Sequence, residues 1–111
     1  MSFMRIIVND IAASKGGAMT VLKDFYETVK LQNDDNEWIF LLGDNYLEET
    51  ENIKVLTFKK EKASQIKRLC FDLFYGRKII NKLNPDVVLS FQNTICFGVK
   101  CKQVVYVLRQ S

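Results

Sequence analysis

The 111-residue sequence contains no histidine, a single proline and three cysteines, and it has no long apolar run. Without histidine the chain lacks the usual general base of enzymes, which excludes Ser–His and Cys–His nucleophilic catalysis. Because no apolar run approaches the roughly 18 residues that cross a bilayer, we expect no membrane span. The opening stretch, MSFMRIIVND, has too short an apolar run for a signal peptide and lacks a small-residue cleavage site.

The cysteines Cys70, Cys96 and Cys101 are odd in number and lack the paired spacing of metal sites. With no CxxC pair and no imidazole partner, we expect no zinc site. We therefore predict reduced, structural thiols in a cytoplasmic protein.

The rest of the composition is that of a folded domain, with 48% hydrophobic and 26% charged residues. The length fits one domain with one core. A net charge of +3 is too small to indicate nucleic-acid binding.

Short, continuous apolar runs alternate with helical periodicity along the chain. Strands are predicted at 4–8, 38–43, 53–58, 86–91 and 103–108, and helices at 18–31 and 63–83. Continuous apolar strands joined through helices are typical of parallel sheets. The sequence therefore predicts an α/β fold, a Rossmann-like three-layer sandwich with a mostly parallel five-stranded sheet, as a single domain over 1–111. No helix is predicted after the fifth strand, so we expect an unfinished layer and a fragment of a longer protein.

A Gly-Gly pair follows the first predicted strand and precedes the first helix. Gly16 and Gly17 would let a phosphate approach the helix N-terminus, and Thr20 lies one turn further on. The spacing matches neither the dinucleotide fingerprint nor the P-loop. A tight turn without a ligand is the competing interpretation.

Polar residues also follow the later strands, at the edge where parallel sheets bind ligands. Gln92, Asn93 and Thr94 come after the fourth strand, and their amides and hydroxyl suit a hydroxyl-rich ligand. A simple Asn/Thr turn is equally compatible with these residues. Asn9 follows the first predicted strand, and Arg109 follows the fifth.

The densest charge feature is a basic segment, KKEKASQIKR, that leads into the second predicted helix. It carries Lys59, Lys60, Lys62, Lys67 and Arg68. With aromatic residues interleaved further along, this patch would fit an anionic membrane surface. A solvated helix face is the alternative, and nucleic acid is disfavoured because acidic residues dilute the run.

Four stretches together resemble the start of family-four glycosyltransferases of the GT-B fold. They are MRIIVNDIAASKGGAMTVLKDF, WIFLLGD, RLCFDLFYGRKIINKLNPDVVLSFQNT and QVVYVLRQS. The resemblance implies the N-terminal, acceptor-side part of a retaining enzyme that transfers a sugar from a nucleotide-sugar to a glycan or lipid-linked acceptor in polysaccharide biosynthesis. It implies no metal cofactor. We expect a cytoplasmic protein, and the basic segment would fit peripheral docking at the cytoplasmic face of the membrane.

By this resemblance the loop at Gly16 and Gly17 faces the donor diphosphate, while the residues after the fourth strand line the acceptor cleft and Arg109 lies near a phosphate. Relatives often carry a histidine after the fifth strand, and residues 106–110 have none. The donor domain of that family, with its paired glutamates, has no counterpart in these 111 residues. We therefore expect no sugar transfer by this chain alone.

The alternative interpretation, from another functional class, is a non-catalytic α/β binding module. An apolar face left uncovered on an unfinished sheet would favour self-association of such a module.

Overall fold

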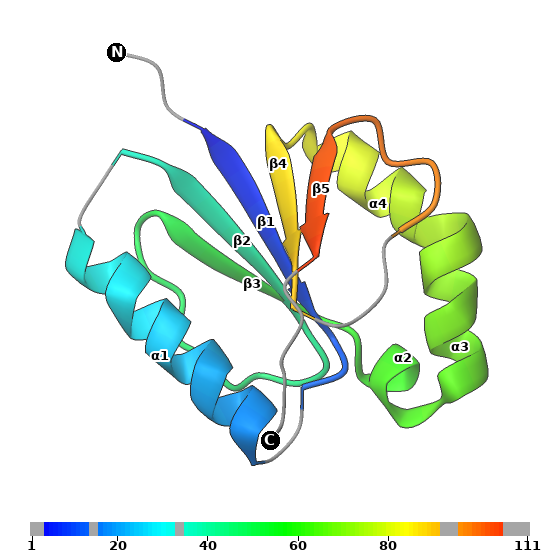
Figure 1. The fold of residues 1–111 in the computed structure, drawn as a ribbon, viewed down its shortest axis with the longest axis horizontal. Coiled ribbons are helices and arrows are strands. Elements are labelled where there is room, and N and C mark those ends of the chain that lie inside the picture. The colour runs from blue at the N-terminus through cyan, green and yellow to red at the C-terminus, as the bar shows by residue number, and fades with distance from the viewer. Residues whose placement is uncertain (1–3, 14–15, 33–34, 92–95, 106–111) are drawn as a thin grey trace.

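The structure, a computed structural model, describes residues 4–13, 16–32, 35–91 and 96–105 (Figure 1). The strands are β1 (Arg5–Asp10), β2 (Glu37–Leu42), β3 (Ile53–Thr57), β4 (Val87–Ser90) and β5 (Lys102–Val105). The helices are α1 (Gly17–Gln32), α2 (Lys59–Ala63), α3 (Gln65–Cys70), the π-helical turn η1 (Phe71–Tyr75) and α4 (Gly76–Leu83).

The strands form one sheet in the order β3-β2-β1-β4-β5, and every neighbouring pair is parallel. Central β1 pairs on both sides, so that Val8 lies opposite Phe40 of β2 and Leu89 of β4. The predicted Rossmann-like α/β fold is confirmed, with the sheet entirely rather than mostly parallel.

Helices lie on both faces of the sheet, as the three-layer prediction requires (Figure 1). Because successive strand residues point to opposite faces, Ile6 and Val8 pack with Leu22 and Tyr26 of α1. Ile7 instead joins Phe71 and Ile80 of the other helical layer. No helix in the described ranges is long and apolar enough to cross a membrane.

In the residues that the structure describes, no helix lies between β2 and β3 or between β4 and β5. Between β2 and β3, residues 43–52 cross the α1 side, where Leu47 is buried in the α1-face core. Tyr26 of α1 holds this segment by donating its hydroxyl to the Glu48 carbonyl at 2.5 Å. Before β5, Cys96 and Val99 pack into the core of the opposite face.

The prediction of a single helix over 63–83 is wrong at its start. The first five residues of the basic segment form the separate short helix α2, and the helix is interrupted at Ser64, whose backbone is extended at φ −134° and ψ 125°. The Ser64 hydroxyl then accepts from the Lys67 amide at 3.4 Å as the N-cap of α3. Helical structure continues to Leu83, but through the wider turn η1 rather than as a regular α-helix.

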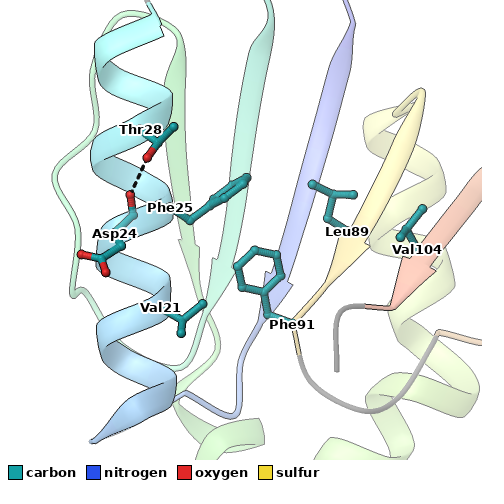
Figure 2. Close-up of a pocket in the computed structure, with 7 residues that line it drawn as sticks. All are labelled: Val21, Asp24, Phe25, Thr28, Leu89, Phe91 and Val104. Atoms are coloured by element: carbon teal, nitrogen blue, oxygen red, sulfur yellow. Dashed lines mark hydrogen bonds between the residues drawn. The ribbon is translucent and has the colours of Figure 1, made fainter. Parts of the chain in front are cut away.

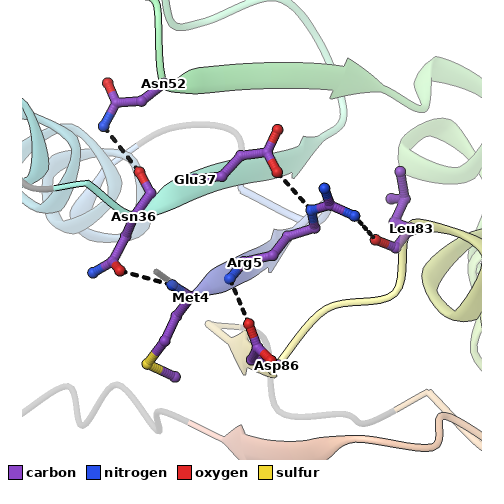
Figure 3. Close-up of polar contacts among 7 residues, drawn as sticks. All are labelled: Met4, Arg5, Asn36, Glu37, Asn52, Leu83 and Asp86. Carbon is purple, nitrogen blue, oxygen red and sulfur yellow. Dashed lines mark hydrogen bonds and ion pairs between the residues drawn. The ribbon is translucent and has the colours of Figure 1, made fainter. Parts of the chain in front are cut away.

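At the amino end of the sheet, Arg5 ties three elements together (Figure 3). Its guanidinium donates to the Glu37 carboxylate of β2 and to the Leu83 carbonyl that ends α4, both at 2.5 Å. Its backbone amide donates to Asp86 Oδ2 at 2.7 Å. A cation at a helix C-terminus satisfies free carbonyls and complements the helix dipole. The polar groups at the amino ends of these strands therefore hold the elements of the fold together.

Candidate functional site

The strand order reverses between β1 and β4, which makes the carboxyl end of these two strands the topological switch point of the sheet. From β1 the chain builds outward through β2 and β3, then returns to place β4 on the other side of β1. In open α/β sheets, ligands bind at this position, outside the carboxyl ends of the strands. Asn9 and Asp10 close β1 there, and Ser90 closes β4.

The Gly-Gly loop leads from β1 into the N-terminus of α1, as the sequence predicted. Gly16 has φ +73°, a left-handed conformation that residues with a Cβ rarely adopt, and no atom of the described residues other than its chain neighbours lies within 4 Å of where its Cβ would stand. Gly17 is the first residue of the 16-residue helix α1. The first helical amides lack carbonyl partners within the helix, so this end favours an anion.

Thr20 lies one turn into α1 and is exposed. Its hydroxyl donates to the Gly16 carbonyl at 3.2 Å, and its amide donates to the same oxygen at 3.1 Å. The Thr20 side chain therefore closes the first turn of the helix in this structure.

Asn9 lies beneath the surface of the switch point rather than on it. It is 1% exposed, and its Nδ2 donates to the Cys96 thiol at 3.7 Å. That thiol donates in turn to Asp72 Oδ1 of η1 at 3.6 Å, which forms a buried polar chain. Asn9 Oδ1 has no hydrogen-bond partner within the described residues. Burial, with the neighbouring Asp72 carboxylate, raises the pKa of Cys96 to about 12, so this thiol stays protonated and unreactive.

Asp10 is the residue at this edge that sequence reasoning did not select. It is 3% exposed, and burial raises its pKa from 3.8 to about 7. The sequence signal was weak, because an Asn-Asp pair after an apolar run is also the usual mark of a turn. A buried carboxyl that titrates near neutral pH is characteristic of functional sites.

The predicted cleft residues Gln92, Asn93 and Thr94, and also Arg109, lie outside the described residues. Their roles stay predictions. The described chain resumes at Cys96, whose amide donates to Gln103 Oε1 at 3.1 Å.

The basic patch is divided between two environments. Lys59 pairs with Asp44 at 3.7 Å, and the Lys62 ammonium contacts the Tyr46 hydroxyl and lies 4.7 Å from its ring centroid. These two lysines are therefore engaged with the segment after β2. Lys60 and Lys67 are exposed, and Arg68 is half-buried.

An apolar groove of about 360 Å³ lies between α1 and the β4–β5 side of the sheet (Figure 2). Its walls are mostly apolar and come from α1 (Val21, Asp24, Phe25 and Thr28), from β4 and the residue after it (Leu89 and Phe91), and from β5 (Val104). The Phe25 and Phe91 rings meet edge to face at 5.1 Å between centroids.

Comparison with known proteins gives no match: no family model, no curated protein and no solved structure matches this chain. The functional proposal therefore rests on the sequence resemblance, together with a fold and a switch point that are compatible with it.

Proposed function

We propose that this chain is the N-terminal, acceptor-side part of a retaining glycosyltransferase, which transfers a sugar from a nucleotide-sugar to a glycan or lipid-linked acceptor in polysaccharide biosynthesis. The observation that carries the proposal is the glycine loop, which enters the N-terminus of α1 directly from central β1, beside the switch point. The sequence resemblance supplies the activity, and the fold is compatible with it.

In this proposal the loop binds the donor diphosphate. Gly16 and Gly17 leave space for phosphate oxygens, and the amide groups and dipole of α1 stabilise the negative charge that grows on the leaving diphosphate. Gln92, Asn93 and Thr94 would contact acceptor hydroxyls, with Arg109 near a phosphate. Asn9 would support this surface from below, because it is buried.

The phosphate role is tested by titrating the ¹⁵N-labelled chain with uridine diphosphate and guanosine diphosphate, and with uridine as a ligand that lacks phosphate. We expect amide shifts confined to the loop and the first turn of α1, at Gly16, Gly17 and Thr20, with the diphosphates only. Absence of such shifts would refute the assignment of the loop.

A charge substitution separates loss of binding from loss of folding. Gly17 is exposed and is not among the glycines with positive φ, so Gly17→Asp requires no left-handed backbone, and its carboxylate at the N-terminus favours helix α1. The same carboxylate repels a diphosphate, and binding should be lost. Gly17→Asn is the neutral control of the same shape and should still bind. Sugar transfer by the purified chain would contradict the expectation that it is inactive alone.

A second candidate function is that of a non-catalytic module that associates with its own copy. The observation in its favour is the apolar groove beside β5, an edge strand whose Val104 and Val105 are 41% and 37% exposed. Unpaired strand edges are templates for pairing with another chain. Light scattering at increasing concentration tests it: a dimer that Val104→Lys dissociates supports this function, and a monomer throughout excludes it.

A further inference from the structure

The segment formed by α3 and η1 carries apolar residues on its outer side as well as on its inner side. Ile66, Leu69, Leu73 and Phe74, here called the apolar stripe, are 75%, 56%, 42% and 61% exposed. Ile66, Leu69 and Leu73 recur at three- and four-residue steps, the spacing of one helix face, and Phe74 adjoins Leu73. In Figure 1 this segment lies at the margin of the molecule, away from the sheet.

The inner side of the same segment is already packed. Phe71 is fully buried and meets Phe58 and Tyr75 edge to face at 5.1 and 5.4 Å between centroids. The apolar stripe therefore contributes little to the core, although four large apolar side chains stand within nine residues. A helix that is apolar on both sides is typically covered on both, and a concentrated exposed apolar patch marks an interaction surface.

The charges around the stripe are all of one sign. Between residues 64 and 83 the one acidic residue is Asp72, which is buried. The exposed charged residues of this segment are Lys67, Arg77, Lys78 and Lys82. The nearest carboxylate on α2, that of Glu61, accepts the Tyr75 hydroxyl at 2.5 Å and is half-buried. The exposed side chains along α3, η1 and α4 thus combine apolar groups with basic groups, of which the Arg77 side chain lies beside Gly98.

We propose that this surface docks on an anionic phospholipid membrane, with the apolar stripe inserted among the lipids and the flanking basic side chains at the headgroups. Apolar residues on one helix face flanked by lysine and arginine are the signature of interfacial binding. Basic residues near the surface of an anionic leaflet each raise partitioning about fivefold. The proposed membrane contact therefore lies on α3, η1 and α4. It does not include Lys59 and Lys62 of the predicted basic patch, because these two lysines contact Asp44 and Tyr46 in the segment after β2. It does not depend on the sugar-nucleotide proposal.

The test is co-sedimentation with vesicles of phosphatidylcholine and phosphatidylglycerol, compared with phosphatidylcholine alone. We expect binding to the anionic vesicles only. The double variant Leu73→Ser and Phe74→Ser should lower the partition coefficient by about tenfold or more, because apolar insertion is lost. Its matched control is Leu31→Ser, at an 83% exposed leucine near the end of α1, which should bind like the wild type.

A charge-reversed pair tests the electrostatic part. Lys67→Glu with Arg77→Glu should abolish binding, whereas Lys23→Glu with Lys30→Glu on α1 changes the net charge equally and should leave binding in place. Circular dichroism of each variant confirms that it folds. Failure of the wild type to bind, or binding unaffected by the serine variant, would overturn the proposal. Concentration-dependent self-association lost in the serine variant, without vesicle binding, would show a protein interface instead.

Discussion

Gly76 should be the most sensitive small residue of the second helical layer. It closes the π-helical turn η1, and its amide donates to the Phe71 carbonyl five residues back. A Cβ at this position would stand 2.4 Å from the Phe71 carbonyl oxygen and 2.9 Å from two carbons of the Phe71 ring. Ordinary contacts begin at 3.4 Å, so the carbonyl would have to move by about 1 Å. The Gly76→Ala variant therefore cannot relax by rotating a flexible side chain.

Two opposing effects set the size of the change. Replacing glycine by alanine inside a helix stabilises it by up to about 1 kcal/mol. Overpacking against backbone and a fully buried ring costs about 3 kcal/mol, at the upper end of such substitutions. The net result is a loss of about 2 kcal/mol, which corresponds to a fall in Tm of roughly 10 °C for a domain of this size.

Urea unfolding followed by circular dichroism measures this difference. The comparison variant is Gly16→Ala, whose Cβ meets no atom within 4 Å among the described residues apart from its chain neighbours, and which carries the backbone strain of φ +73°. It should lose about 1 kcal/mol. If Gly76→Ala is as stable as the wild type or more stable, helix propensity outweighs overpacking against Phe71. That result would refute the expected loss of stability.

Three further predictions concern buried and strained groups. Because burial raises the pKa of Asp10 from 3.8 to about 7, the native state holds this proton more tightly, and stability is lost as the pH rises between these values. At about pH 8, Asp10→Asn should therefore be more stable than the wild type, by at most about 4 kcal/mol, and near pH 4 the two should match in urea titrations. In the native protein, Cys96 should resist thiol reagents until denaturant is added, whereas the half-buried Cys70 and Cys101 should label first in mass spectra; early labelling of Cys96 would contradict its burial. Asn84 ends α4 at φ +54°, so Asn84→Ala should cost about 1 kcal/mol in thermal unfolding and Asn84→Gly should not; equal losses would contradict the capping role.

The fold class could be predicted from the sequence because the residue pattern of each strand indicates whether its two faces are buried. WIFLL in β2 is buried at every position, and such continuous apolar runs occur in parallel strands covered on both faces. Likewise, α1 buries Leu22, Tyr26 and Val29 at helical spacing. The strand order β3-β2-β1-β4-β5 follows from pairing across the whole chain, which local patterns do not contain.

The helical layer on the other face was harder to predict. Apolar steps of three and four run through residues 63–83, and nothing in that periodicity marks an extra residue in one turn. The turn η1 depends on tertiary packing of Phe71 against Phe58, and on the absence of a side chain at Gly76. Ser64 carried a clearer signal, because serine is a preferred N-cap.

At the candidate site, the missing information was the length of β1. Ending the strand at Val8 made Asn9 and Asp10 resemble loop residues. In the structure they pair with Leu41 and Leu42 of β2, so that Asn9 turns inward to Cys96 and Asp10 is buried. Burial, and not residue type, gives Asp10 its raised pKa.

The π-helical turn η1 contributes residues both to the region beneath the switch point and to the apolar stripe. In η1, Asp72 points inward and joins Cys96 and Asn9 beneath the switch point, while the next residues, Leu73 and Phe74, face outward in the apolar stripe. In a regular α-helix, Asp72, Leu73 and Phe74 would point in directions different from those in η1, because a π-helical turn holds more residues than an α-helical turn. The conformation that buries the carboxylate therefore also exposes the two apolar side chains. Moving Phe71, as Gly76→Ala must, should disturb vesicle binding and the protection of Cys96 together.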